Sequence, residues 1–343
     1  MTIKIAINGF GRIGRGVLRA LIENGVGDVE VVAINDLSPP ETIAHLLKYD
    51  SVHGRLKTRV RVDDGDLVVG TQRIRLTAIR NPADLPWQDV DVAYECTGLF
   101  TDRDKAAQHL QNGSKRVLIS APGKDADRTV VYGVNHLDLT ADDVIVSNAS
   151  CTTNCLAPVA MVLDRAFGIK TGYMTTIHSF TGDQPSHDTS HNDLYRARAA
   201  SLSMVPTSTG AARAISLVLP RLNGRLEGSA VRVPTPNVSL VDLSFVPEIK
   251  ASRNEINAAV RDAASSDLAG ILAYEEAPLV SVDFNHDPHS SCFAAAQTSV
   301  TEDGLVRIVS WYDNEWGFSN RMVDTGRRIG ELLHDAAPLK IAC

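Results

Sequence analysis

A cysteine among small polar residues is the first candidate for chemistry in this sequence. Cys151 lies in the segment 148–155, NASCTTNC, between a strand-like apolar run and a helix-like apolar run. A thiol at the start of a helix can be stabilised as the thiolate, so we expect the pKa of Cys151 to be lowered and the residue to act as a nucleophile. The neighbouring hydroxyls and N–H groups could bind a phosphate or an oxyanion. Pro158 leaves two possibilities, because the regular helix either begins close to it or is kinked there.

A thiolate nucleophile needs a base, and the chain has ten histidines. His178 follows the apolar run 173–177 and precedes a polar loop, which is a common place for a catalytic group and equally common for a structural histidine. We interpret the remaining thiols as small apolar side chains; they are Cys96, Cys155, Cys292 and Cys343. Cys151 and Cys155 stand four apart without a second pair at zinc-finger spacing, so we expect no metal site.

A second motif indicates dinucleotide binding. The run NGFGRIGR at 8–15 contains G-x-G-x-x-G after a strand-like run and before a helix-like one, as the dinucleotide fingerprint requires. Gly9 would form the tight turn, Gly11 would admit a pyrophosphate, and Gly14 would let helix and strand pack closely. Asp36 ends the next strand, where an acid accepts hydrogen bonds from ribose hydroxyls. A carboxylate there favours NAD, because it would repel the 2′-phosphate of NADP and no arginine lies in 37–40.

The elements that must hold these residues divide into two groups. In the first 150 residues we predict strands at 3–7, 29–34, 90–95, 116–120 and 143–147, with helices at 15–24 and 102–112. After about residue 170 we predict strands at 172–177, 228–233, 239–246 and 305–311, with helices at 207–219, 254–265 and 319–333. The fold class is therefore α/β, with a Rossmann-type doubly wound parallel sheet plus an α+β catalytic domain that has a mixed or antiparallel sheet.

The length agrees with two domains, and because no Pro/Gly/Ser linker separates the halves we expect them to pack closely. For 343 residues we expect an NAD-binding domain at 1–150, completed by the C-terminal helix 318–343, and a catalytic domain at 151–317. A net charge of -7 without a basic run argues against nucleic-acid binding. We expect no membrane span and no signal peptide. Five scattered cysteines suit a reducing compartment, so we expect a cytoplasmic protein.

Five motifs together resemble one enzyme family. They are NGFGRIGR at 8–15, SCTTNCLAP at 150–158, TGAA at 209–212, RVPTPNVS at 232–239 and WYDNEWG at 311–317. In this order they are similar to phosphorylating glyceraldehyde-3-phosphate dehydrogenase (type I), and the resemblance runs from residue 3 to about 333. It implies oxidation of glyceraldehyde 3-phosphate to 1,3-bisphosphoglycerate with reduction of NAD, a reaction of glycolysis and gluconeogenesis. Cys151 would carry the thiohemiacetal and thioester, and His178 would activate Cys151 and take the hydroxyl proton.

The resemblance also implies three groups of binding residues. The site for the substrate's phosphate would contain Thr181, Asp183 and Arg232. The site for inorganic phosphate would contain Ser150, Thr152, Arg198, Thr209 and Gly210. The cofactor site would add to the fingerprint glycines and Asp36 the residues Arg12, Ile13, Arg80, Thr97, Gly98, Ser120 and Asn314, of which Asn314 would hold the nicotinamide carboxamide. Without the resemblance, Arg80, Arg198 and Arg232 would be ordinary surface cations.

The chain departs from the family pattern at a few positions. Phe318 stands where many relatives carry Tyr, which keeps the ring and loses the hydroxyl. Strictly NAD-using bacterial relatives often have Leu-Pro where Thr189-Ser190 stand here, whereas the dual-specificity chloroplast form has Ser at the second position. Ser190 could bond a 2′-phosphate, but Leu37 stands where the chloroplast form has Thr, so we expect NAD first with measurable NADP use. The loop 180–203 would, by resemblance, pack across subunits in a homotetramer.

Other functions remain possible at this point. Erythrose-4-phosphate dehydrogenase shares the fold, the Cys and the His, although the segment 208–212 resembles the triose-phosphate enzyme. A non-phosphorylating dehydrogenase would need no second anion site, which Thr152 and Thr209 argue against. A non-catalytic NAD-binding redox sensor would use an oxidisable Cys151 without turnover.

Overall fold

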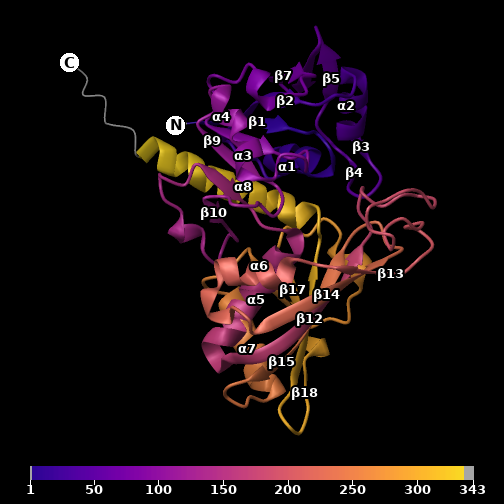
Figure 1. Cartoon of the computed structure of the whole chain (residues 1–343), viewed down its shortest axis with the longest axis vertical. Coiled ribbons are helices and arrows are strands. Elements are labelled where there is room, and N and C mark those ends of the chain that lie inside the picture. Colours follow the sequence, from indigo (N-terminus) through magenta and orange to yellow (C-terminus); the bar gives the residue numbers. More distant parts are fainter. Residues whose placement is uncertain (1, 336–343) are drawn as a thin grey trace. The chain divides into compact units, whose positions relative to one another are not determined.

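The computed structural model describes residues 2–335, which form two compact units. Unit 1 contains residues 2–130, 136–149 and 319–335, and unit 2 contains residues 131–135 and 150–318. Figure 1 labels many of their elements, which are numbered in chain order. The short segment 131–135 thus clusters with unit 2 although it precedes residue 150. The last eight residues of the expected helix 318–343, and with them Cys343, lie outside the described residues.

Unit 1 is built on a nine-stranded sheet among its described residues. In sheet order the strands are β10 (Arg128–Thr129), β11 (Ile145–Ser147), β9 (Arg116–Ile119), β8 (Val92–Glu95), β1 (Ile3–Asn8), β2 (Val29–Asn35), β7 (Gln72–Thr77), β6 (Asp66–Val69) and β5 (Val60–Asp63). Pairing is parallel from β10 to β7 and antiparallel from β7 to β5. β1 is central, with β2 on one side and β8 on the other, so the strand order reverses beside it. Ligands of doubly wound sheets bind at the carboxyl ends of strands at such a point.

The helices of unit 1 begin with the one that follows the fingerprint. They are α1 (Arg12–Glu23), α2 (Pro40–Lys48), α3 (Arg103–Ala106), α4 (Gln108–Gln111) and most of α8 (Trp316–Asp335), and β3 (Tyr49–Asp50) pairs with β4 (Gly54–Arg55). In α8, Gly326 and Gly330 permit close approach to Tyr94 and Ile3, because a Cβ at either glycine would overlap those side chains. Residues 319–335 of this helix therefore pack against β8 and β1.

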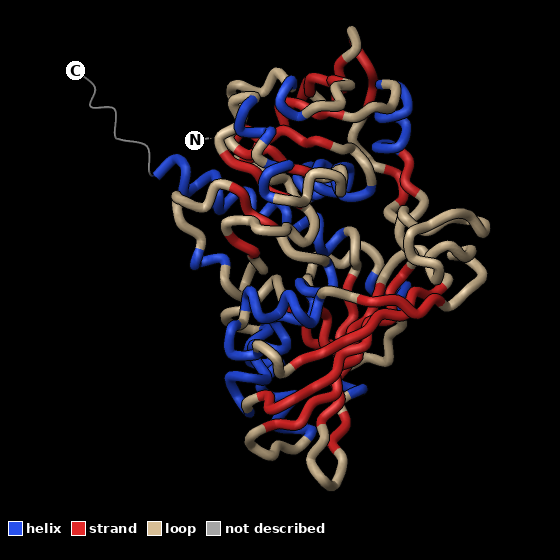
Figure 2. Tube along the Cα trace, in the orientation of Figure 1, coloured by secondary structure: helices blue, strands red, loops and turns tan. Residues whose placement is uncertain are grey.

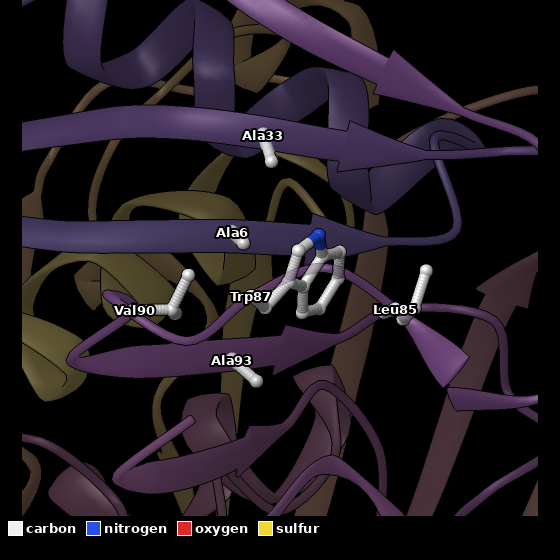
Figure 3. Close-up of a cluster of buried hydrophobic side chains, with 6 residues drawn as sticks. All are labelled: Ala6, Ala33, Leu85, Trp87, Val90 and Ala93. Carbon is white, nitrogen blue, oxygen red and sulfur yellow. The ribbon is translucent and has the colours of Figure 1, made fainter. Parts of the chain in front are cut away.

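A tryptophan fills one part of the unit 1 core. Ala6, Ala33 and Ala93 lie side by side on β1, β2 and β8, and their small side chains leave room for the indole of Trp87 (Figure 3). Trp87 is 1 % exposed and packs there with Leu85 and Val90.

Unit 2 contains an eight-stranded mixed sheet among its described residues. In order its strands are β13 (Val205–Ser208), β14 (Leu226–Val233), β12 (Ile169–Ser179), β15 (Ser239–Pro247), β19 (Val306–Tyr312), β17 (Ser291–Ala294) and β16 (Leu272–Glu275), and β18 (Ser299–Val300) pairs with β19. The helices α5 (Cys151–Phe167), α6 (Ala211–Val218) and α7 (Arg253–Ala264) pack on this sheet. Short 3-10 helices complete the elements. Unit 2 has them at Pro220–Leu222, Ser281–Phe284 and Ala295–Gln297, and unit 1 has them at Pro82–Asp84 and His136–Asp138. A long irregular segment, residues 180–204, separates β12 from β13 (Figure 2).

The α/β fold class predicted from the sequence is confirmed, and several elements differ in detail. The expected helix 102–112 is two short helices, α3 and α4, and the start of the expected helix 207–219 belongs to β13. The antiparallel extension β5–β7 was not predicted. Helix α5 begins at Cys151 and continues through Pro158 to Phe167, so the possibility that it begins near the proline is wrong. No helix among residues 2–335 combines the length and the apolar character needed to cross a bilayer.

Candidate active site

Cys151 is the first residue of α5. Ser150 caps this helix, since its side chain accepts a hydrogen bond from the backbone N–H of Thr153 at 3.1 Å. Ala149, just before the cap, has φ 56°, a left-handed conformation that L-residues rarely adopt, so the chain turns sharply into the helix. The local sequence therefore places the Cys151 thiol beside the N–H groups of a helix start.

His178 faces the Cys151 thiol. Near the end of β12, its Nε2 lies 3.5 Å from Cys151 Sγ. Its Nδ1 lies 2.7 Å from the carbonyl oxygen of Ser179 and 2.6 Å from a guanidinium nitrogen of Arg232. The ring of Tyr312 meets the imidazole edge-on at 5.9 Å. The two groups that sequence reasoning could pair only by resemblance are thus in contact.

The protonation of this pair differs from what a helix N-terminus alone would suggest. Burial raises the pKa of the Cys151 thiol, while the charge of Arg232 and hydrogen bonds from Thr152 act in the opposite direction. The expectation of a lowered thiol pKa is therefore wrong for this state of the protein. Burial and the Arg232 charge lower the pKa of His178 to about 3. At neutral pH the pair is a thiol beside a neutral imidazole, which is ready to accept a proton.

Cationic and hydroxyl side chains gather beside His178. Thr181 donates a hydrogen bond to Asp183, and Asp183 accepts one from Arg196 at 3.0 Å. The Nε of Arg232 is buried and has no hydrogen-bond partner. Arg196 also acts electrostatically on both His178 and Arg232. This arrangement offers an anion several donors at one place.

The residues expected at the second anion site are arranged differently. Thr152 is buried and its hydroxyl lies 2.9 Å from that of Tyr312, while the Thr209 hydroxyl accepts a hydrogen bond from the N–H of Ala211 at the start of α6. Gly210 is the residue before that helix, which packs against α5. Arg198 is exposed and paired with Asp188 at 2.7 Å, and among described residues it forms no hydrogen bond or ion pair with another member of the predicted site. Here the structure brings Arg196, rather than Arg198, toward the reacting pair.

Asn314 lies in the loop between β19 and α8. Its Oδ1 accepts hydrogen bonds from the hydroxyls of Ser179 at 2.9 Å and Ser239 at 2.8 Å. All three residues are buried. Ser179 directly follows His178, so one residue contacts both the candidate base and the Asn314 amide.

In unit 1, a cavity of about 370 Å³ lies at the carboxyl ends of β1, β2 and β8. It is lined by Asn8, Gly9, Gly11, Asn35, Asp36, Leu37, Ile79, Arg80, Cys96, Thr97, Leu99 and Phe100. A Cβ at Gly9 would overlap the backbone of Thr97 and one at Gly14 would overlap Gly9, whereas one at Gly11 would project into open space. The fingerprint thus packs tightly on one side and leaves room for a pyrophosphate on the other.

The Asp36 carboxylate is held for hydrogen bonding to a ribose. Its two oxygens accept the N–H groups of Phe10 at 2.8 Å and Ser38 at 2.9 Å. Although burial opposes ionisation, these hydrogen bonds hold the pKa of Asp36 below its usual value. The carboxylate stays charged at neutral pH, and its remaining lone pairs can accept ribose hydroxyls.

The other predicted cofactor residues do not line this cavity. Arg12, at the start of α1, forms a two-point ion pair with Asp50. Ile13 and Gly14 lie in α1, Gly98 follows Thr97 with φ 73°, and the Ser120 N–H donates to the carbonyl of Glu95. Ser190 is exposed in the segment 180–204.

Comparison with known proteins decides the family. The model described as "Glyceraldehyde 3-phosphate dehydrogenase, NAD binding domain" matches residues 3–103, and the one for the C-terminal domain matches residues 150–314. The chain is 65 % identical to glyceraldehyde-3-phosphate dehydrogenase of Cereibacter sphaeroides over 333 residues, which cover 97 % of this chain and 100 % of that protein. It is 62 % identical to the enzyme of that name from Xanthobacter flavus over 97 % and 100 % of the two chains, and 54 % identical to glyceraldehyde-3-phosphate dehydrogenase 1 of Bacillus subtilis over 96 % and 99 %.

The chain belongs to the glyceraldehyde-3-phosphate dehydrogenase family. As a member of this family it is an NAD-dependent oxidoreductase. The resemblance predicted from the five motifs is confirmed.

Two residues of this dehydrogenase site were missed by sequence reasoning. Arg196 stands two positions before Arg198, and nothing in the pattern Arg-Ala-Arg shows which of the two cations turns toward Asp183. Tyr312 joins the hydroxyls of Thr152 and Thr176, at 2.9 and 2.8 Å, behind Cys151 and His178. In the sequence, only the position of Tyr312 within the motif WYDNEWG could have indicated a role at the site.

Proposed function

We propose that this protein oxidises glyceraldehyde 3-phosphate to 1,3-bisphosphoglycerate, with inorganic phosphate as the second substrate, Cys151 as nucleophile and His178 as base. The main support for this proposal is the 3.5 Å contact between Sγ of Cys151, at the start of α5, and Nε2 of His178. A neutral imidazole beside a protonated thiol can accept the thiol proton as the sulfur attacks an aldehyde carbon.

Proton transfer at His178 accompanies each covalent step. As Cys151 Sγ bonds to the aldehyde carbon, the thiol proton passes through His178 Nε2 to the aldehyde oxygen and yields a thiohemiacetal. NAD, held by Asp36 and the fingerprint glycines, would supply the hydride acceptor for that carbon. His178 takes the hydroxyl proton at the same stage, which leaves a thioester on Cys151. An oxygen of inorganic phosphate then attacks the thioester carbon, and the departing Cys151 sulfur recovers the proton from His178.

We assign the substrate's phosphate to Thr181, Asp183 and Arg232, and we add Arg196 to this group. Support comes from the chain of contacts from Thr181 through Asp183 to Arg196, and from the unpartnered buried Nε of Arg232. A bound dianion would neutralise the cations that now suppress protonation of His178. The attacking phosphate would use Ser150, Thr152, Thr209 and Gly210, with Arg198 contributing only if it leaves Asp188.

Residues 1–150 with the C-terminal helix would form the NAD-binding domain, and residues 151–317 the catalytic domain. The cavity at the carboxyl ends of β1, β2 and β8, the open face of Gly11 and the ionised Asp36 fit the adenosine and pyrophosphate parts of NAD. Arg12, Ile13, Gly98, Ser120 and Ser190 remain proposed contacts. NADP would serve as a second, weaker cofactor.

Self-association into a homotetramer is part of the proposal. Apolar side chains on the segment 180–204 stand 64–81 % exposed; they are Leu194, Tyr195, Leu202 and Met204. Exposed apolar side chains that recur along one segment are compatible with a contact surface between subunits. Light scattering on the eluted protein would test the tetramer, and cell fractionation would test the expected cytoplasmic location.

The decisive experiment measures nicotinamide reduction with glyceraldehyde 3-phosphate, with and without inorganic phosphate. We expect phosphate-dependent turnover that Cys151→Ser abolishes and Cys155→Ser, which removes a buried thiol whose pKa is raised to about 12, retains. Turnover indifferent to phosphate would instead indicate a non-phosphorylating dehydrogenase. Turnover only with erythrose 4-phosphate, or cofactor binding without turnover, would favour the two other functions considered from the sequence.

A further inference from the structure

The amide of Asn314 is held in one orientation by two buried serines. Ser179 and Ser239 are 0 % and 1 % exposed, and both hydroxyls lie within hydrogen-bond distance of Asn314 Oδ1. The backbone on either side of Asn314 is fixed as well, because the Asp313 carboxylate accepts the N–H groups of Glu315 and Trp316. An asparagine with a fixed backbone can still turn its amide by half a turn, so the serines decide which end faces outward.

Only one orientation of the Asn314 amide gives every buried hydroxyl hydrogen of this cluster an acceptor. Ser239 Oγ already accepts the backbone N–H of Ser179 at 3.0 Å, so its single hydrogen is free to be donated. With Oδ1 facing the serines, each hydroxyl hydrogen has an acceptor. With the amide reversed, Nδ2 would face both hydroxyls and at least one buried hydroxyl hydrogen would have none. A buried hydroxyl hydrogen without an acceptor destabilises the protein, which favours the first arrangement.

The amide nitrogen is consequently left as a donor. Among the described residues, Asn314 Nδ2 makes no hydrogen bond, whereas Oδ1 makes two. We propose that Ser179 and Ser239 are positioning residues that fix the Asn314 amide so that it donates to the carbonyl oxygen of the nicotinamide carboxamide. The inference rests on the proposed function, in which Asn314 holds that carboxamide.

Ser179 also connects this amide to the base. Its carbonyl oxygen lies 2.7 Å from His178 Nδ1 while its hydroxyl donates to Asn314. One residue therefore orients both the imidazole and the amide.

A cofactor analogue separates the two amide orientations. 3-Acetylpyridine adenine dinucleotide keeps the carbonyl oxygen of the carboxamide and replaces its NH₂ by a methyl group. A site that donates to the oxygen binds NAD and this analogue alike, and a site that presents Asn Oδ1 favours NAD. Binding is measured calorimetrically without substrate, on wild type, Ser179→Ala, Ser239→Ala and Asn314→Ala. Ser291→Ala is the matched control, because Ser291 belongs to a separate buried pair with Ser310 at 2.7 Å.

We expect wild type and Ser291→Ala to bind both dinucleotides within about threefold of each other. In either serine-to-alanine variant the amide can reverse, so the affinity for the analogue should fall about three- to tenfold relative to NAD. Ser239→Thr keeps the hydroxyl and should restore the wild-type ratio.

Two results would overturn the inference while leaving the proposed function intact. One is a wild-type affinity for the analogue that is more than tenfold weaker than the affinity for NAD. The other is an unchanged ratio in both serine variants while Asn314→Ala weakens both dinucleotides. If Asn314→Ala changes neither affinity, the role of Asn314 in the proposed function fails instead. Should Ser239→Ala fail to fold, Ser179→Ala tests the same ratio independently.

Discussion

A guanidinium nitrogen of Arg232 lies 2.6 Å from Nδ1 of His178, and both nitrogens face the carbonyl oxygen of Ser179. If Nδ1 carries a hydrogen, it donates to that carbonyl and Nε2 presents a lone pair to Cys151. If Nδ1 is bare, it accepts from Arg232 and Nε2 becomes a donor to the sulfur. In both tautomers the adjacent cation disfavours the doubly protonated ring.

Removing the cation should raise the pKa of His178. The groups that face this ring are Arg232, Arg196, Asp183, Cys151 and Tyr312, and burial with the Arg232 charge lowers the pKa to about 3. We expect Arg232→Gln to raise the pKa of His178 toward the ordinary value near 6.5. The rise should be about one pH unit or more, which is the usual effect of a charge in close contact. Titration of the nitrogen-15 signals of histidine in the folded protein measures the change.

The matched control is Arg198→Gln, which removes an exposed guanidinium paired with Asp188. It should leave the His178 titration where it is in wild type. An Arg232→Gln titration that coincides with wild type would show that burial alone suppresses the imidazolium.

The same shift predicts how stability depends on pH. The folded-state pKa of His178 is about 3 and the unfolded value is about 6.5, so between these values the unfolded chain binds the proton and the folded chain does not. The contribution of this residue therefore falls as the pH drops from about 6.5 toward 3, by up to about 1.4 kcal/mol per pH unit. Urea unfolding of wild type and His178→Gln between pH 7 and 4 should show a smaller acid loss in the variant. Parallel curves would mean that His178 titrates in the folded protein as it does in the unfolded chain.

The fold was largely predictable because its signals are local. The run 3–8, the glycines of 9–14 and the run 29–35 lie next to one another in the sequence, and each predicts its own element. The antiparallel extension β5–β7 was missed because 60–77 mixes charged and apolar residues without a long apolar run. The helix expected at 207–219 was wrong at its start, since pairing of Thr207 and Ser208 with β14 outweighs local helical periodicity.

The site was predictable only in part, since its contacts join distant segments. Cys151 begins α5 and His178 lies near the end of β12, and no spacing rule predicts the distance between them. Composition also could not give the sign of the Cys151 pKa shift, because burial opposes the helix start and the Arg232 charge. The choice between Arg196 and Arg198 likewise depends on the path of an irregular segment rather than on a periodic pattern.

The core of unit 1 should depend strongly on Trp87. This side chain is 1 % exposed and rests on the three alanines of β1, β2 and β8. The short alanine side chains cannot fill the cavity that loss of the indole would leave. We therefore expect Trp87→Ala to lower the free energy of unfolding by about 3–5 kcal/mol. Circular dichroism in urea measures this, with Leu137→Ala, a 74 % exposed residue of unit 1, as a control that should cost less than about 0.5 kcal/mol. A loss as small as that of the control would mean that the surroundings collapse into the space.

Cofactor choice should depend on the charge of Asp36. Its carboxylate is held ionised by the N–H groups of Ser38 and Phe10, so it repels the 2′-phosphate of NADP. Asp36→Asn keeps the shape and removes the charge, and we expect the ratio of kcat/KM for NADP to that for NAD to rise about five- to tenfold, as expected for about 1 kcal/mol of repulsion near the surface. Steady-state kinetics with both cofactors measure the ratio, and Asp64→Asn, an exposed acid of the same unit, is the charge control.

Ser190 tests the opposite contribution to the same ratio. If its hydroxyl bonds the 2′-phosphate, Ser190→Ala should lower the NADP-to-NAD ratio about two- to tenfold, the effect of one hydrogen bond. Ser190 belongs to the exposed segment 180–204, which carries the apolar side chains proposed to pack between subunits, so the measurement must be made on the assembled protein. A ratio that moves with Asp36→Asn but not with Ser190→Ala would assign cofactor choice to the carboxylate alone and remove Ser190 from the proposed cofactor site.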